Sequence, residues 1–247
     1  ATLSIQAVET DQVTGACQAL LLNNRTVEMA VECISPNSCG AASNQVNSTP
    51  VSTNGSGMVN SFSDVTLNFG DASSSTASFT NTYNDAGTLR LWARYQLLNS
   101  SGAATGNVIQ GSSNVFVNRP AGFCIESPDA NWQCSAPALN AGCSAFKQAG
   151  DNFNLLVTAK QANGASTDYC SHGTTNNFNN SVDLSHNLIS PTASDGGEAG
   201  NFSLTSINLT SGTGNSAVNF SEMGVFTITA GGNTYFTETL PTNSSVN

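Results

Sequence analysis

The chain has 247 residues, a formal net charge of −10 and a sequence pI near 4.2. Six Lys and Arg residues stand against sixteen Asp and Glu residues, which argues against nucleic acids and anionic membrane surfaces as partners. Only 9% of the residues are charged and no apolar run is as long as a membrane span, so we expect no membrane insertion and a surface of Ser, Thr, Asn and Gly.

Segments that alternate apolar and polar residues predict β-strands through the first half of the chain. The first covers Thr2–Val8, and residues 18–22 and 26–33 are expected to form a hairpin around a turn at residues 23–25. Between residues 35 and 63 the composition falls to Pro, Asn, Ser, Gly and Thr, which predicts a long excursion over the surface. Later strands are expected over residues 65–69, 77–81, 89–97, 108–109 and 114–117.

The second half repeats this pattern after a hinge at Pro120, because proline ends ladder hydrogen bonding. Residues 125–144 are too irregular for strands and are expected to form an insertion stapled by disulfides. Strands are expected over residues 153–159, 182–189, 200–204, 217–221, 225–230 and 234–238. Short strands separated by turn residues predict an all-β fold with two tandem immunoglobulin-like β-sandwich modules, residues 1–118 and 119–247.

One local pattern occurs in each half. Tyr83-Asn84-Asp85-Ala86-Gly87 precedes a predicted strand, and so does Phe220-Ser221-Glu222-Met223-Gly224. Both are typical of a corner in a sandwich, where glycine supplies a positive φ and the carboxylate caps loop amides.

The cysteines indicate a disulfide framework in an oxidising compartment, and hence an extracellular or cell-surface location. None of them forms a C-x-x-C pair, so the paired spacing of a zinc site is missing. The disulfide candidates are Cys17, Cys33, Cys39, Cys124, Cys134, Cys143 and Cys170.

Two pairings are open in the first module. The predicted hairpin favours Cys17–Cys33 and leaves Cys39 as an exposed thiol for a partner subunit. The competing pairing joins Cys33 to Cys39 and leaves Cys17 as a buried, inert thiol on a strand.

Several short blocks resemble the C-terminal region of MshQ-like proteins, which are associated with biogenesis of the mannose-sensitive haemagglutinin (MSHA) type IV pilus in Gram-negative bacteria. The blocks are Phe116-Val117-Asn118-Arg119-Pro120 with Phe123, Ala149-Gly150-Asp151-Asn152-Phe153, and Phe220-Ser221-Glu222-Met223-Gly224-Val225-Phe226. The resemblance implies a secreted or surface-exposed β-rich protein linked to pili and adhesion, without catalytic residues to carry over. It also implies that the chain is part of a longer protein or a shorter relative.

The motifs of the common enzyme classes are missing from the sequence. It has no G-x-S-x-G, no H-E-x-x-H, no Walker loop and no Rossmann fingerprint, and its histidines are His172 and His186. A glycosidase needs paired carboxylates in an aromatic-lined cleft, whereas Asp195 and Glu198 lie in a glycine-rich loop. We therefore expect no enzyme and no cofactor.

Scattered carboxylates make two loose calcium sets conceivable. One is Asp64, Asp71 and Asp85, and the other is Asp168, Asp195 and Glu198. Loop carboxylates are usually solvated, so no metal site is expected. A Lys–Asn isopeptide crosslink at Lys147 or Lys160 is not expected either.

These observations together predict a non-enzymatic structural or adhesion component of a bacterial surface appendage, whose partners are other surface proteins or further copies of itself. One alternative is a repeating fibre subunit in which Thr2–Val8 inserts into a neighbour. The other alternative is a glycan-binding adhesion module, with Trp132 as the candidate exposed aromatic contact.

Overall fold

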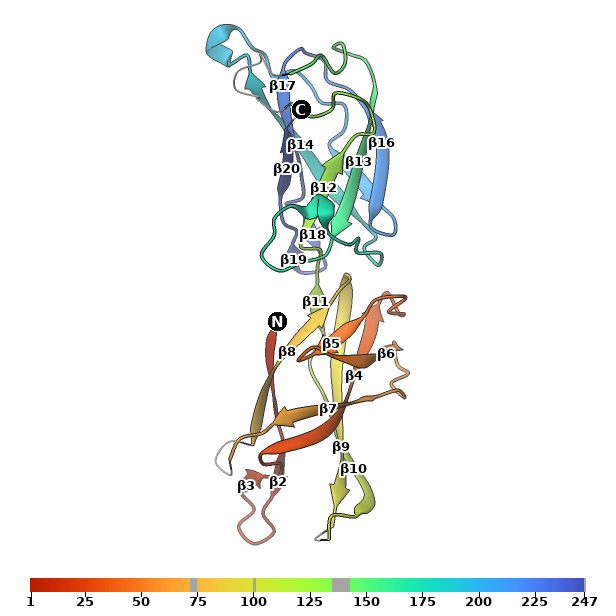
Figure 1. Ribbon diagram of the computed structural model, residues 1–247, viewed down its shortest axis with the longest axis vertical. Coiled ribbons are helices and arrows are strands. Elements are labelled where there is room, and N and C mark those ends of the chain that lie inside the picture. Colours follow the sequence, from red (N-terminus) through yellow and green to blue (C-terminus); the bar gives the residue numbers. More distant parts are fainter. Residues whose placement is uncertain (72–74, 100, 135–142, 247) are drawn as a thin grey trace. The chain divides into compact units, whose positions relative to one another are not determined.

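The structure is a computed structural model that describes residues 1–71, 75–99, 101–134 and 143–246 (Figure 1). Its regular elements are β-strands, apart from two 3-10 helical turns in these ranges, η1 (Tyr169–Ser171) and η2 (Ala193–Asp195). The predicted all-β class is therefore confirmed. Within the described ranges, no helix has the length and apolarity needed to cross a bilayer. The chain divides into two compact units, Ala1–Asn118 and Arg119–Asn247.

The first unit is built on a nine-stranded sheet with the order β1-β8-β5-β6-β4-β9-β10, in which β7 also pairs with β4 and β11 with β9. A separate hairpin joins β2 to β3. The strands are β1 (Thr2–Gln6), β2 (Val8–Thr10), β3 (Cys17–Ala19), β4 (Asn24–Ser35), β5 (Asn44–Val46), β6 (Thr49–Gly55), β7 (Ser63–Asn68), β8 (Thr76–Tyr83), β9 (Gly87–Leu98), β10 (Ala104–Ser112) and β11 (Phe116–Asn118).

Alternation along the strands places one face of each in the core of this unit. In β8, Ala77, Phe79, Asn81 and Tyr83 are buried, while Ser78, Thr80 and Thr82 are exposed. The side chains of Ala77, Phe79 and Tyr83 share one hydrophobic cluster with Met29 of β4 and Leu91 of β9. Burial of such side chains stabilises the unit by about 1.5–3 kcal/mol for each large apolar residue.

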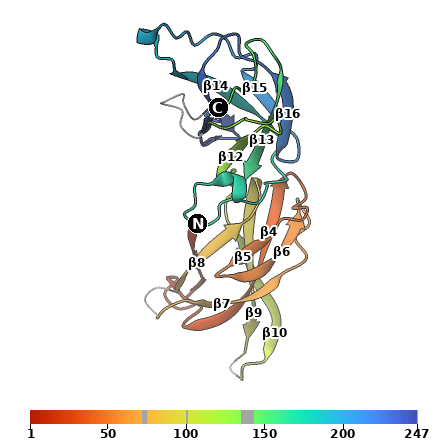
Figure 2. The same cartoon turned by 45° about the horizontal axis from the view of Figure 1, so that its top comes forward.

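Two predictions about the strands and loops of the first unit are wrong. Residues 18–22 and 26–33 do not form a hairpin, because β3 pairs with β2 while β4 pairs with β6, β7 and β9. Residues 35–63 are not only a surface excursion, because they contain β5 and β6. Strand β6 lies parallel to β4 (Figure 2). The polar composition of this segment hid its strands, since two of its buried positions are Asn44 and Asn54.

The second unit contains a three-stranded sheet, β12-β13-β16, and a four-stranded sheet, β15-β14-β17-β20, which together have a sandwich-like arrangement (Figure 1). The hairpin β18-β19 lies outside both sheets. The strands are β12 (Gly122–Glu126), β13 (Phe153–Lys160), β14 (Asn180–Ser190), β15 (Ser206–Leu209), β16 (Thr213–Val218), β17 (Val225–Ala230), β18 (Thr234–Tyr235), β19 (Glu238–Thr239) and β20 (Asn243–Val246).

The core of the second unit lies between these two sheets. Leu155 and Val157 of β13 are buried, as are Val182 of β14 and Ile228 of β17. Segment 200–204, predicted as a strand, contributes only a bridge from Phe202 to Phe220. Strands β12, β15 and β20 were not predicted. β15 alternates over only four residues, β20 is mostly polar, and β12 runs into the segment 125–144 that was expected to be an insertion without strands. The part of the predicted insertion at residues 135–142 lies outside the described residues.

The corner prediction is confirmed at Gly87 and is wrong in part at Gly224. Gly87 has a φ of 148°, and the Asp85 carboxylate accepts a hydrogen bond from the amide of Ala86 at 2.8 Å. Gly224 does not have a positive φ, but a Cβ there would lie 2.5 Å from Leu188 Cδ1. Glycine is thus needed for backbone conformation and space at the first corner, and for space alone at the second.

Replacing Gly87 with Ala is expected to lower the free energy of unfolding of the first unit by about 1–3 kcal/mol. The added Cβ would lie 2.5 Å from the Ser35 carbonyl oxygen, and the φ is unfavourable for alanine. Urea denaturation of the full chain measures the change. Gly111→Ala is the matched control, because no atom lies within 4 Å of a Cβ at that position. Equal stability of the two variants would contradict this account.

Candidate functional site

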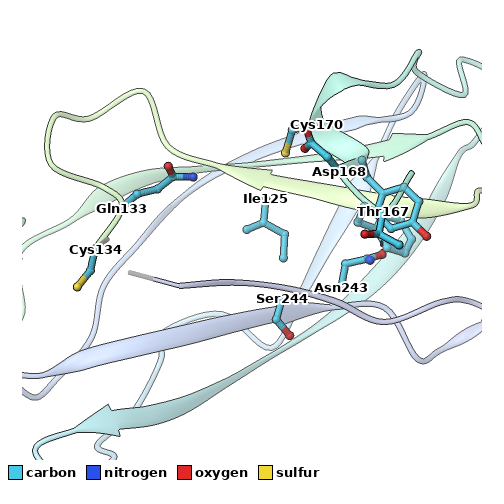
Figure 3. Close-up of a pocket in the computed structure, with 10 residues that line it drawn as sticks. Ile125, Gln133, Cys134, Thr167, Asp168, Cys170, Asn243 and Ser244 are labelled. Atoms are coloured by element: carbon cyan, nitrogen blue, oxygen red, sulfur yellow. Dashed lines mark hydrogen bonds between the residues drawn. The ribbon is translucent and has the colours of Figure 1, made fainter. Parts of the chain in front are cut away.

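The candidate site is a cleft of about 500 Å³ in the second unit, which we call the β12–β20 cleft (Figure 3). In the view of Figure 3, Ile125 lies between Asp168 on one side and Asn243 with Ser244 on the other. The lining residues come from β12, β20, the η1 segment and the loop after β12. They are Phe123, Ile125, Gln133, Cys134, Thr167, Asp168, Tyr169, Cys170, Asn243 and Ser244.

The floor and one wall of the cleft are formed by the edge strands of the two sheets. Phe123 and Ile125 of β12 are buried and give the floor an apolar character. The backbone N–H of Phe123 donates to Asn243 Oδ1 at 2.8 Å, which links β12 to β20. The Asn243 amide nitrogen stays available to a ligand, since no described residue accepts a hydrogen bond from it. Ser244 and Thr229 share a hydrogen bond between their hydroxyl oxygens at 2.8 Å.

The opposite wall is the η1 segment, which the Cys124–Cys170 disulfide fastens to β12. The Asp168 carbonyl accepts hydrogen bonds from the backbone N–H and the hydroxyl of Ser171, at 3.2 and 2.8 Å. Tyr169 is half-buried, and its ring packs so closely on Gly122 that a Cβ there would lie 2.6 Å from the ring. The backbone of Asp168 and the ring of Tyr169 are therefore held in place by local hydrogen bonding, packing and the neighbouring disulfide.

The chemistry of the cleft is polar and almost uncharged. Among its lining residues Asp168 is the one carboxylate, and no Lys, Arg or His lines the cleft. Amide and hydroxyl groups come from Gln133, Thr167, Asn243 and Ser244. These groups offer hydrogen-bond donors and acceptors beside the apolar floor, an arrangement that can bind a small polar molecule.

Neither histidine lines this cleft, and of the calcium candidates only Asp168 does. His172 is buried, and its Nδ1 is 2.9 Å from the Gln161 carbonyl oxygen, whereas His186 packs among Phe202, Phe220 and Phe226. Within the described ranges, the one group of three candidate metal ligands is Cys124, Glu126 and Cys170. Its two sulfurs are joined in a disulfide and are not thiolate ligands. Neither carboxylate set considered for calcium is brought together there.

Trp132 is not the exposed aromatic contact that the glycan alternative requires. It is only 6% exposed, and its ring lies 5.6 Å from the centroids of Phe146 and Phe153. The stretch 131–134 nevertheless reaches the cleft through Gln133 and Cys134. The sequence thus led to Trp132, a neighbour of the lining residues, as the ligand contact, and it did not point to Tyr169 or Asn243.

The predicted disulfide framework is present in three bonds, Cys33–Cys39, Cys124–Cys170 and Cys134–Cys143. The favoured pairing Cys17–Cys33 is wrong, because Cys17 lies on β3 opposite Thr10 of β2. Cys33 and Cys39 have a Cα–Cα distance of 5.4 Å, which suits a disulfide. Cys17 is the unpaired cysteine, and it is exposed, whereas the competing pairing had placed it in the core.

We expect the native, unreduced chain to react with one equivalent of a maleimide, at Cys17, since that thiol is exposed and the other cysteines are in disulfides. Peptide mapping without reduction should recover a Cys33–Cys39 crosslink. Cys17→Ser supplies the control and should abolish labelling. A Cys17–Cys33 peptide, or labelling at Cys39, would refute the assignment.

A second, apolar cleft of about 500 Å³ lies in the first unit, between edge strands β1 and β10. Its lining includes Leu3 and Ile5 of β1, Tyr95 of β9 and Ile109 of β10. The hydrophobic core of the unit, including Phe79 and Leu91, forms its floor. Hydrogen-bonding side chains also line it, among them Gln6, Arg94 and Gln110.

Charged groups of the first unit gather on the other face of β4 and β9. Glu32 is 4% exposed, and its carboxylate accepts hydrogen bonds of 2.8 Å from Gly57 N–H and from Trp92 Nε1. Arg90 lies 3.6 Å away. Burial by itself raises the pKa of Glu32, but the hydrogen bonds and the Arg90 charge outweigh it, so the pKa is lowered.

A second ion pair on this face joins Glu28 to Arg94 through two hydrogen bonds, at 2.9 and 2.8 Å. The hydrogen bonds from Arg94 lower the pKa of Glu28. The Arg94 guanidinium also lies 4.0 Å from the centroid of the Phe62 ring. Both pairs connect β4 to β9 and have the character of structural links.

Comparison with known families gives two matches. Residues 1–112 match a family described as a domain of unknown function (DUF6701), first Ig-like domain, and residues 119–219 match one described as DUF6701, second domain. The immunoglobulin-like prediction for the first module is thereby confirmed. A search of curated proteins and a search of solved structures gave no match.

Proposed function

We propose that this chain, which matches the first and second DUF6701 domains in tandem, is a non-enzymatic extracellular component of a bacterial surface appendage. We propose further that it is pilus-associated and MshQ-like, with a role in structure and adhesion. The observation that carries the proposal is the β12–β20 cleft. Its ligand-facing groups sit on strand edges and on a segment that the Cys124–Cys170 bond holds to the sheet. Binding groups on a rigid scaffold are what an adhesion protein needs.

Two further features support this proposal. Three disulfides suit an oxidising compartment such as the cell exterior. The low charge and the abundance of Ser, Thr, Asn and Gly suit a surface that resists nonspecific association. The blocks around Pro120 and Phe220 resemble MshQ-like proteins, and this resemblance is the reason for proposing an association with a pilus.

The fibre alternative has less support than the isolated module. Residues Thr2–Gln6 pair antiparallel with β8 of the same chain, from Thr2 opposite Thr80 to Gln6 opposite Thr76. The amino terminus also donates to the Asn81 carbonyl oxygen at 2.8 Å. The segment considered for donation therefore completes its own sheet.

Deleting the gene in the bacterium that encodes the chain tests the proposal. We expect deletion to reduce attachment of the cells to surfaces, and we expect the wild-type gene to restore it. A gene carrying Cys124→Ala with Cys170→Ala should restore attachment less well, because the wall of the cleft is then released. Unchanged attachment after deletion would contradict the adhesive role.

A further inference from the structure

We infer that the β12–β20 cleft binds a neutral glycan, an inference that rests on the adhesive role proposed above and names its ligand class. The cleft measures about 500 Å³. Ligand pockets of about 300–1,000 Å³ accept small organic molecules, so one or two sugar residues fit.

The hydrogen-bonding groups of the cleft match a polyhydroxylated ligand. No described residue donates to the carboxylate of Asp168, so that both oxygens are available to accept bonds from hydroxyl groups. Asn243 accepts from Phe123 N–H through Oδ1, which fixes the amide so that Nδ2 is the group left to donate. A free carboxylate acceptor on a segment that the Cys124–Cys170 bond holds to β12, together with a fixed amide donor, is a combination that can recognise sugar hydroxyls, each of which both donates and accepts.

The apolar part of the cleft suits the carbon-bound faces of a sugar ring. Ile125 forms the floor, and Tyr169 supplies an aromatic ring that is immobilised by its packing on Gly122 and by an edge contact with His172, at 5.4 Å between centroids. A rigid aromatic side chain adds contact area at a small entropic cost. Thr167 and Gln133 add polar groups at the rim.

The negative charge of the cleft disfavours acidic glycans. With Asp168 and without any Lys, Arg or His among the lining residues, the cleft repels sialylated, sulfated and phosphorylated sugars. Amide and hydroxyl groups outnumber the single carboxylate, so the ligand that satisfies most of the lining is uncharged.

An array of neutral and sialylated glycans, followed by titration of the full chain with the tightest-bound neutral oligosaccharide, tests the inference. We expect binding to neutral members only. Asp168→Asn should weaken it by about 10- to 100-fold, which is the effect of losing a hydrogen bond to a charged group. Gln133→Ala should weaken it less. Asp151→Asn, a change at another exposed carboxylate of the same unit, is the matched control and should leave affinity unchanged.

Asp168 and Gln133 are exposed, so neither change removes a buried side chain, and circular dichroism verifies folding of each variant. Silence of the array, preference for sialylated glycans, or equal binding by wild type and Asp168→Asn would each overturn the inference. Attachment of cells that depends on the gene while the array stays silent would reject the glycan and leave the adhesive role standing.

Discussion

Removing the Cys124–Cys170 disulfide by a double change to alanine is expected to destabilise the second unit by about 4 kcal/mol. The bond closes a loop with a sequence separation of 46 residues, so its loss returns a large conformational entropy to the unfolded chain. The same change releases η1 from β12, so the cleft should lose its ligand-facing geometry. Hydrogen exchange followed by mass spectrometry on the full chain measures the effect at β12, β13 and β16.

The Cys33–Cys39 bond is the natural control for this prediction. Its sequence separation is 6 residues, and its removal should cost about 2 kcal/mol in the first unit. Exchange in the second unit should not change in that control. A larger loss of protection from the Cys33–Cys39 variant than from the Cys124–Cys170 variant would contradict the loop-entropy argument.

The second large effect is expected at Glu32. Replacing Glu32 with Ala leaves Gly57 N–H and Trp92 Nε1 without their acceptor and Arg90 without its partner carboxylate. We expect the free energy of unfolding of the first unit to fall by about 3 kcal/mol, because buried groups that lose their partners keep their desolvation cost. Urea denaturation at pH 7 measures this loss. A stability within about 0.5 kcal/mol of wild type would show that the hydrogen bonds are not formed.

The same carboxylate gives the first unit a pH dependence of known sign. The pKa of Glu32 is lower in the folded chain than in the unfolded chain, so its contribution is complete above the ordinary glutamate pKa of about 4.3. It is lost as the pH falls through the lower folded-state value. In the Glu32→Ala variant, the free energy of unfolding should therefore fall less steeply as the pH is lowered below the ordinary glutamate pKa. Glu28→Ala is the control, because its half-exposed pair with Arg94 should contribute about 1 kcal/mol or less.

The strands that could be predicted from the sequence are those in which apolar and polar residues alternate along the strand itself. Strand β17 occupies the predicted residues Val225–Ala230, and β13 extends the prediction by one residue at Lys160, because each buries alternate apolar side chains. Pairing could not be predicted in the same way. β4 shares its edges with three partners, and none of them is the strand that precedes it in the chain.

Polar residues in buried positions explain the other errors in the fold. Asn54 on β6 is 6% exposed and fixes the following loop, since its side chain donates to the Ser61 carbonyl at 2.9 Å and accepts from Ser61 N–H at 3.0 Å. A segment rich in Asn and Ser therefore forms ordered structure through side-chain hydrogen bonds. Such bonds cannot be predicted from the pattern of apolar residues in the sequence. This is why residues 35–63 were predicted as a surface excursion.

The candidate site was beyond sequence reasoning because it is assembled from distant segments. Asp168 comes from a loop and Asn243 from a short polar strand near the end of the chain, and only the closeness of β12 and β20 brings them to one cleft. Trp132 was selected for its ring, but Phe146 and Phe153 bury that ring. The all-β class depends on composition and patterning and could be predicted, whereas a binding site depends on tertiary contacts.

Immunogold electron microscopy of intact cells of the encoding bacterium, with antibodies raised against the full chain, tests whether the chain is a component of a surface appendage. We expect label on filaments or tips at the cell surface, and no such label in cells that lack the gene. Label confined to the cell interior, with surface appendages unlabelled, would contradict the claim that this chain is a component of a surface appendage.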